Sequence, residues 1–187
     1  MADNSTPKRS KRSKTNVPVD MEALRSAFYQ AFGEAMSAFG GIEVGLMSTF
    51  RALLRPQNPK CADDLFTSMT GFKVRLDMVT TLMKSAQLSD QVRGAWNGAA
   101  TRIAAAQKKR NAIAHMHVRE MTGKDMFGHD PSTDFASLPL PWGARMNHVQ
   151  TTQKLKGYAK EFNEVARLVF EFNNRIETSM RAPRVSA

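Results

Sequence analysis

Three side chains that can act on a phosphate ester fall within six residues of this chain. Residues 110–115 read Arg-Asn-Ala-Ile-Ala-His, so a guanidinium, an amide and an imidazole follow one another closely. A guanidinium makes bidentate contacts with phosphate oxygens, and an imidazole exchanges protons near neutral pH. On a helix, Asn111 and His115 are four residues apart and share a face beside Arg110, with the three groups inside roughly 7.5 Å of helix rise. The spacing therefore indicates a site for proton transfer next to a phosphate.

The residues that precede this motif predict a helix that carries it. An N-cap at Ser89 or Asp90 would begin this helix. Its apolar positions recur at steps of three and four, and the series runs Val92, Trp96, Ala99, Ile103, Ala106, Arg110, Ile113 and His117. Arg110 thus occupies a position where the pattern asks for an apolar side chain. An arginine turned toward a core or an interface must be paired or must serve a function.

Charged residues elsewhere in the chain are candidates to support the motif or to pair with it. Glu43 lies beside the apolar stripe of the first helix and is a candidate partner for Arg110, although it also fits an exposed surface carboxylate. Asp77 is the other carboxylate that could pair with Arg110 and fix helix packing. Lys108 and Lys109 form a basic patch on the approach to Asn111. They would either raise the local potential for a phosphate or complement the helix dipole.

The remaining pattern predicts three further helices. The first extends from an N-cap at Asp20 to about residue 55, and the second starts at Asp63 or Asp64 and keeps an apolar seam from Leu65 to Met83. The last starts near Asn147 and stops at Pro183. In the first helix, small residues four apart would let a neighbouring helix approach closely, or mark a kink; they are Gly33, Ser37, Gly41, Gly45 and Thr49.

These helices predict an all-α fold, a four-helix up-and-down bundle over residues 18–181. A basic arm over 1–17 and a tail over 182–187 flank it. From about 118 to 146 the apolar residues follow no sustained period, and an irregular segment this long suggests a lid, a binding loop or a small hairpin. Five apolar residues could anchor it over the bundle, namely Phe127, Phe135, Leu138, Leu140 and Trp142.

The composition favours polyanionic partners, most simply nucleic acid, because 27 Lys and Arg face 17 Asp and Glu for a net charge of +10. Five of these positive charges lie within seven residues of the arm, at Lys8, Arg9, Lys11, Arg12 and Lys14. With no large apolar side chain before Val17, the arm is predicted to be disordered. It would either anchor RNA electrostatically or serve as a solvated tail.

Several other classes of protein and site are disfavoured. A single cysteine, Cys61, fits a reducing cytoplasm, and no apolar run approaches the roughly 20 residues that span a bilayer. His115 and His117 are two apart on the predicted helix, about 200° around it, so they cannot chelate one metal ion together. No spacing joins His129, Asp130 or His148 to them. We expect a cytoplasmic protein with no metal and no cofactor.

The arrangement resembles the HEPN superfamily. The likeness rests on an Arg, a polar residue, three further residues and a His on the third helix of a four-helix bundle, and the helix order extends it over roughly residues 20 to 180. The resemblance implies a homodimer in which both copies of the motif line one cleft. Similar proteins with an active motif are metal-independent RNases, which gives the endoribonuclease of a toxin or defence system as the expected function.

The resemblance also implies a role for each residue of the motif. His115 would be the general base or acid at a ribose 2′-hydroxyl or at the leaving 5′-oxygen. Arg110 would stabilise charge on the transition state, and Asn111 would orient the phosphate or His115. Many members of the superfamily are instead noncatalytic partners of nucleotidyltransferases or scaffolds. The alternative is therefore an interaction or nucleotide-binding module, and an antitoxin or a nucleotidyltransferase is the expected protein partner.

Overall fold

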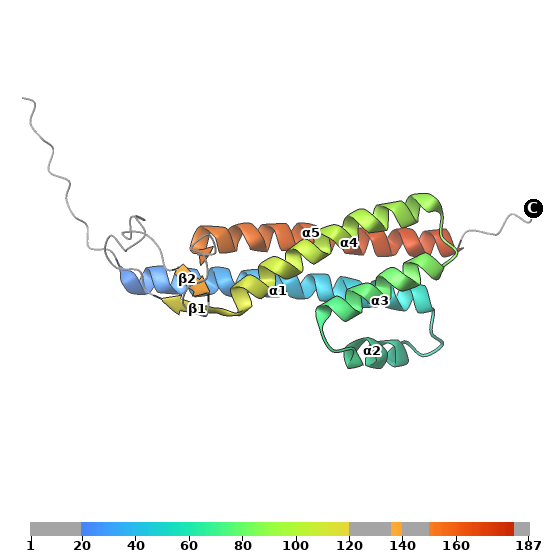
Figure 1. Cartoon of the computed structure of the whole chain (residues 1–187), viewed down its shortest axis with the longest axis horizontal. Helices are drawn as coiled ribbons and strands as arrows, with labels where there is room; N and C mark the ends of the chain where they lie inside the picture. Colours follow the sequence, from blue (N-terminus) through green and yellow to red (C-terminus); the bar gives the residue numbers. More distant parts are fainter. Residues whose placement is uncertain (1–19, 120–135, 140–149, 182–187) are drawn as a thin grey trace, which may run out of the picture.

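The structure, a computed structural model, describes residues 20–119, 136–139 and 150–181, and this part of the chain is mostly helical (Figure 1). The predicted all-α class is confirmed in this sense. Its helices are α1 (Met21–Leu54), α2 (Pro59–Ser68), α3 (Phe72–Ser85), α4 (Asp90–Ala114) and α5 (Thr152–Arg181). Three short strands accompany them, β1 (Met116–Arg119), β2 (Ala136–Pro139) and β3 (Gln150–Thr151).

The first helix is continuous, as predicted. Asp20 caps it by accepting hydrogen bonds from the backbone N–H groups of Glu22 and Ala23, both at 3.1 Å. The helix continues through Gly40 and Gly41 and ends at Arg55, whose left-handed backbone (φ 48°) closes it with a hydrogen bond to the Arg51 carbonyl. This gives α1 34 residues, enough to run along the whole bundle.

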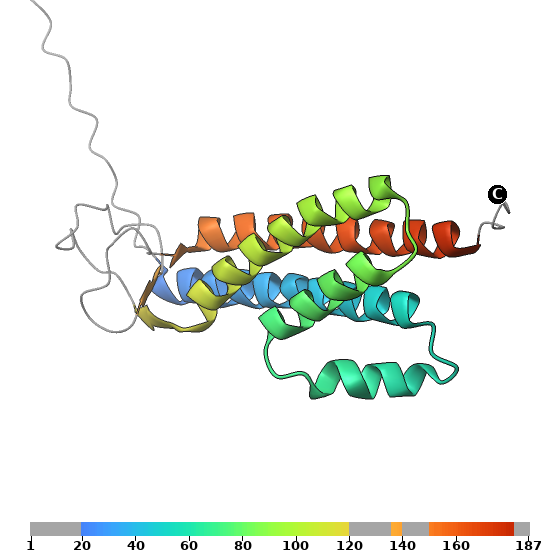
Figure 2. The same ribbon diagram turned by 45° about the vertical axis from the view of Figure 1, so that its right-hand side comes forward.

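Helices α1 and α5 lie side by side and run in the same direction (Figures 1 and 2). The small residues of α1 permit the close approach. A Cβ added at Gly45 would lie 2.9 Å from Cγ1 of Val169, and one at Gly41 would lie 3.4 Å from Cβ of Ala166. The interpretation of this row as a packing surface is therefore confirmed for Gly41 and Gly45.

The other end of the same row does not pack against α5. Nothing lies within 4 Å of a Cβ added at Gly33. Instead, Gly33 and Ser37 line an open groove of about 570 Å³, together with Ala159 and Asn163 of α5. The row thus serves helix packing only in its second half.

The predicted second helix is two helices, which corrects the prediction of four. Helix α2 starts earlier than expected, at Pro59, with Asn58 as its N-cap. The backbone of Gly71, with φ 91°, then interrupts the helical conformation before α3. An L-residue would be strained in that conformation, so glycine allows the turn. Successive helices still run in opposite directions (Figures 1 and 2). Because there are five helices instead of four, the first and the last, α1 and α5, are parallel.

Helix α2 packs on the end of α1 and adds Ala62 and Phe66 to the buried core. Phe66 is buried against Phe50 with ring centroids 5.5 Å apart, whereas Leu65, predicted in the apolar seam, is 53% exposed. Arg51 donates two hydrogen bonds to Asp63, and these raise the pKa of the Arg51 guanidinium. Apolar burial and an ion pair with α1 therefore both hold the helix.

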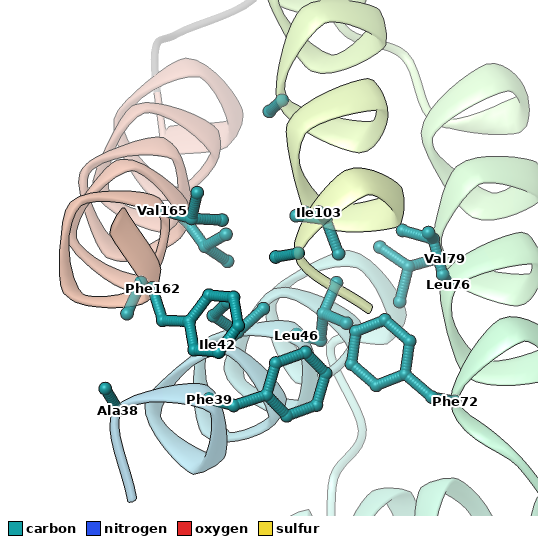
Figure 3. Packing of buried hydrophobic residues seen from close by; sticks show 14 of the residues in the cluster. Ala38, Phe39, Ile42, Leu46, Phe72, Leu76, Val79, Ile103, Phe162 and Val165 are labelled. Carbon is teal, nitrogen blue, oxygen red and sulfur yellow. The ribbon is translucent and has the colours of Figure 1, made fainter. Parts of the chain in front are cut away.

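The core lies between α1, α3, α4 and α5 (Figure 3). Phe39 of α1 lies between Phe72 of α3 and Phe162 of α5, at centroid distances of 5.0 and 5.6 Å. Ile103 of α4 is fully buried in the same cluster. These contacts fix where α4 sits on α1, and therefore where the motif at its end lies.

After α4 the chain changes to strands, which corrects the helical assignment of His117. The helix ends at Ala114, and His117 lies in β1, paired with Leu138 of β2 in an antiparallel register. Strand β2 also pairs with β3. Helix α5 follows β3 directly and begins at Thr152, which corrects the predicted start near Asn147. The pairing of β1 with β2 fits a small hairpin, one of the three alternatives for the segment 118–146, and residues 120–135 and 140–146 lie outside the described residues.

Several predictions fall on residues that the structure does not describe. They concern the basic arm over 1–17, the tail over 182–187, the metal candidates His129, Asp130 and His148, and the anchors Phe127, Phe135, Leu140 and Trp142. The division into arm, bundle and tail stays a prediction. No helix within the described ranges is long and apolar enough to cross a membrane.

Candidate functional site

Arg110 lies half-buried on the inner side of α4, as its place in the apolar stripe predicts. Its guanidinium carbon is 5.4 Å from the centroid of the Phe39 ring, which is within the range of a cation–π contact. Its Nε is buried and has no hydrogen-bond partner among the described residues. The positive charge therefore rests on an aromatic face, and no carboxylate of the described residues pairs with it.

The amide of Asn111 is the polar group that the structure brings to Arg110. Nη1 of Arg110 donates a hydrogen bond of 3.1 Å to Oδ1 of Asn111. Asn111 is exposed, so its amide NH2 faces solvent beside the guanidinium. The pair combines a cation with neutral donors, which suits a phosphate oxygen.

His115 ends α4. It is the C-cap residue, and its backbone N–H donates to the Asn111 carbonyl at 3.3 Å. Its side chain is exposed and makes no hydrogen bond with any residue that the structure describes. The imidazole therefore lies one helical turn after Asn111, at the exposed end of α4, and makes no hydrogen bond with Arg110.

The carboxylates expected to pair with Arg110 contact other cations, which corrects the proposed support by Glu43. Oε1 of Glu43 lies 3.4 Å from Nη1 of Arg75, and Asp77 forms an ion pair with Lys73 one turn earlier in α3. Arg75 also donates to the Met69 carbonyl at 3.2 Å and stacks on Phe66. Glu43 therefore fastens α3 to α1 and is not the partner of Arg110.

The two lysines before Arg110 differ in their surroundings. Lys109 forms an ion pair with Glu161 of α5, and its Nζ lies 5.6 Å from the centroid of the Tyr158 ring. Lys108 is exposed and forms no ion pair within the described part of the chain. Of the two lysines in the predicted basic patch, Lys108 can raise the positive electrostatic potential at the site, while Lys109 links α4 to α5 through its ion pair.

The outer face of α4 carries small side chains, and no described helix or strand covers them. Gly94, Gly98, Thr101 and Ala105 are all exposed and follow one another at steps of four, three and four. A Cβ added at Gly94 or Gly98 would meet nothing within 4 Å. Lys108 continues this face to within one turn of Asn111. The helix that carries the motif thus has an open side along most of its length.

Sequence reasoning missed Phe39 as a member of the site. Phe39 is 2% exposed and belongs to the apolar stripe of α1, where it looks like any other core residue. Only the packing of α4 on α1 reveals that its ring supports Arg110. No pattern in the sequence links two residues 71 positions apart, so no signal could have found this contact.

Metal ligation finds no support in the described ranges, since no three His, Cys, Asp or Glu side chains gather there in a way that could hold an ion. Cys61 is an exposed free thiol in the first turn of α2. The chemistry available at the site is that of Arg110, Asn111 and His115: anion binding, hydrogen bonding and proton exchange.

Comparison of the chain with protein-family models, with curated proteins and with solved structures gives no match.

Proposed function

We propose that this protein is a HEPN-type, metal-independent endoribonuclease, acting as a toxin or defence effector on RNA. The observation that carries the proposal is Arg110. It is half-buried, stacked on Phe39 and bonded to Asn111, and it has no carboxylate partner among the described side chains. A structural arginine would be expected to form an ion pair, whereas one that receives a phosphate must keep its charge.

The motif supplies the groups for cleavage through the ribose 2′-hydroxyl. His115 removes the proton of the 2′-hydroxyl, or protonates the leaving 5′-oxygen, from its exposed position at the end of α4. Arg110 stabilises the charge on the phosphorus-centred transition state, and Asn111 orients the phosphate. The 2′-hydroxyl is itself the nucleophile, so the reaction needs no metal ion and leaves a 2′,3′-cyclic phosphate.

The protein would act as a homodimer. The exposed small residues of α4 would let a second copy of this helix approach closely, with the exposed Asn111 and His115 beside this contact and Arg110 on the inner side of its own helix. In this arrangement α1, α3, α4 and α5 are the four helices of the HEPN-like bundle, and α2 is an addition outside it. The basic arm with Lys8, Arg9, Lys11, Arg12 and Lys14 would bind RNA beyond the cleft.

A noncatalytic HEPN-like module is the second candidate function, and one observation favours it. The His115 imidazole has no orienting hydrogen bond among the described residues, although an efficient general base is held in place by a partner. Such a module would bind a nucleotide or a protein partner, such as a nucleotidyltransferase or an antitoxin, through the same exposed groups.

Cleavage assays on variants separate the two functions. The wild-type protein should cleave RNA in excess chelator, and His115→Ala and Arg110→Ala should each lower the rate by about 100-fold or more, since a positioned acid or base contributes on the order of 10² to 10⁴. Arg102→Ala is the matched control, because this arginine of the same helix contacts Glu164 at the surface. Equal cleavage by all three variants would show that the activity does not belong to the motif.

A further inference from the structure

We infer that Phe39 is a positioning residue, which holds the Arg110 guanidinium in place without neutralising it. The inference rests on the proposed function in that the anion to be received is an RNA phosphate. It adds a residue of a different helix, buried in the core, to a motif that otherwise lies within six residues of α4.

The geometry supports this role. The guanidinium carbon of Arg110 lies 5.4 Å from the Phe39 centroid, and the ring is 2% exposed, so the contact is shielded from water. Phe39 is in turn fixed between Phe72 and Phe162, with centroids 5.0 and 5.6 Å away. A ring held from two sides cannot follow the guanidinium, and the guanidinium is therefore confined to the ring face.

The neighbouring lysine shows why an aromatic support matters. Lys109 and Arg110 are adjacent on α4, and each lies over an aromatic ring, Tyr158 and Phe39 respectively. Lys109 is neutralised by Glu161 as well, whereas Arg110 has the Asn111 amide instead of a carboxylate. An aromatic face attracts a cation through its quadrupole and brings no opposite charge. Phe39 thus orders the guanidinium and leaves its full charge to an incoming phosphate.

A pair of core variants tests this role. Phe39→Leu removes the aromatic face and keeps an apolar side chain. Phe50→Leu is the matched control, because Phe50 is an equally buried ring of the same helix that lies against Phe66 of α2. The probe is a single-stranded RNA with every 2′-hydroxyl methylated, which presents phosphates and cannot be cleaved. We expect Phe39→Leu to raise its dissociation constant about tenfold, and Phe50→Leu to change it less than twofold.

The same variants in an Arg110→Ala background show whether the effect passes through Arg110. Once Arg110 is absent, Phe39→Leu should weaken binding no further, because the ring has no cation to position. An equal loss for Phe39→Leu and Phe50→Leu, or an undiminished loss in the Arg110→Ala background, would overturn the inference. So would failure of the wild-type protein to bind the methylated RNA.

Activity distinguishes this inference from the proposed function. With unmodified RNA, Phe39→Leu should lower kcat about tenfold at temperatures where both leucine variants remain folded, while Phe50→Leu retains it. If the wild-type protein binds the methylated strand through Arg110 and Phe39 but cleaves no RNA, the nuclease proposal fails and the positioning role of Phe39 stands. Melting curves of both variants confirm that their cores are weakened alike.

Discussion

At the scale of single residues, the partners of charged side chains decide what the motif can do. Glu43, Glu161 and Glu164 contact Arg75, Lys109 and Arg102, so the carboxylates near the bundle surface are already engaged by cations other than Arg110. This pattern separates structural cations from a functional one. It also assigns Glu43 to helix packing, and that assignment has a measurable consequence.

Glu43→Gln should lower the free energy of unfolding by about 1 kcal/mol and leave RNA binding and cleavage unchanged. The pair with Arg75 is partly buried, with the two side chains 34% and 23% exposed, so its loss costs more than a fully solvated pair and less than a buried one. Urea unfolding measures the first effect, with the exposed Glu34→Gln of the same helix as control. If Glu43→Gln lost cleavage while remaining folded, Glu43 would have a role in the site and not only in helix packing.

At the scale of helices, periodicity predicted the long elements and failed where tertiary packing decides. The apolar stripes of α1, α4 and α5 extend over many turns, so their existence could be read from the sequence. The break between α2 and α3 depends on one glycine at Gly71, within a seam that remains periodic across it. Likewise, the pairing of Glu43 with Arg75 depends on how α3 sits on α1, which spacing along one helix does not reveal.

Two glycines of α1 give opposite predictions. Gly45→Ala should destabilise the protein by up to about 2 kcal/mol, because its Cβ would lie 2.9 Å from Cγ1 of Val169 and such overpacking typically costs more than alanine gains in helix propensity. Gly33→Ala meets nothing within 4 Å and should stabilise by up to about 1 kcal/mol. Urea unfolding of the two variants side by side checks the sign of each. A stabilising Gly45→Ala would mean that α1 and α5 are not in close contact there.

At the scale of the whole molecule, the motif lies at the end of a helix whose outer side is exposed. Helix α4 contacts α1, α3 and α5 on its inner side, and its outer side presents Gly94, Gly98, Thr101 and Ala105. The proposed dimer would bury this face. The all-α class and the long helices could thus be predicted from the sequence, whereas the number of helices and the support of Arg110 by Phe39 could not.

Ala105→Arg should prevent the dimer from forming and lower RNA cleavage with it. A long charged side chain in the middle of the exposed face of α4 would hold a second helix away, while the monomer has room for it because Ala105 is exposed. Light scattering on the purified protein measures the assembly, and Ala23→Arg, at an exposed position of α1, is the control. If the wild-type protein is itself a monomer at all concentrations, the shared cleft is ruled out.

The most direct measurement is cleavage, in excess chelator, of two RNA strands of the same sequence, one with ribose and one with 2′-O-methyl ribose throughout. Mass spectrometry of the products identifies the new ends. We predict that the ribose strand is cut to fragments ending in a 2′,3′-cyclic phosphate, that the methylated strand stays intact, and that Arg110→Ala and His115→Ala cut neither. Cleavage of both strands, or of neither by the wild-type protein, would contradict a nuclease that uses the 2′-hydroxyl.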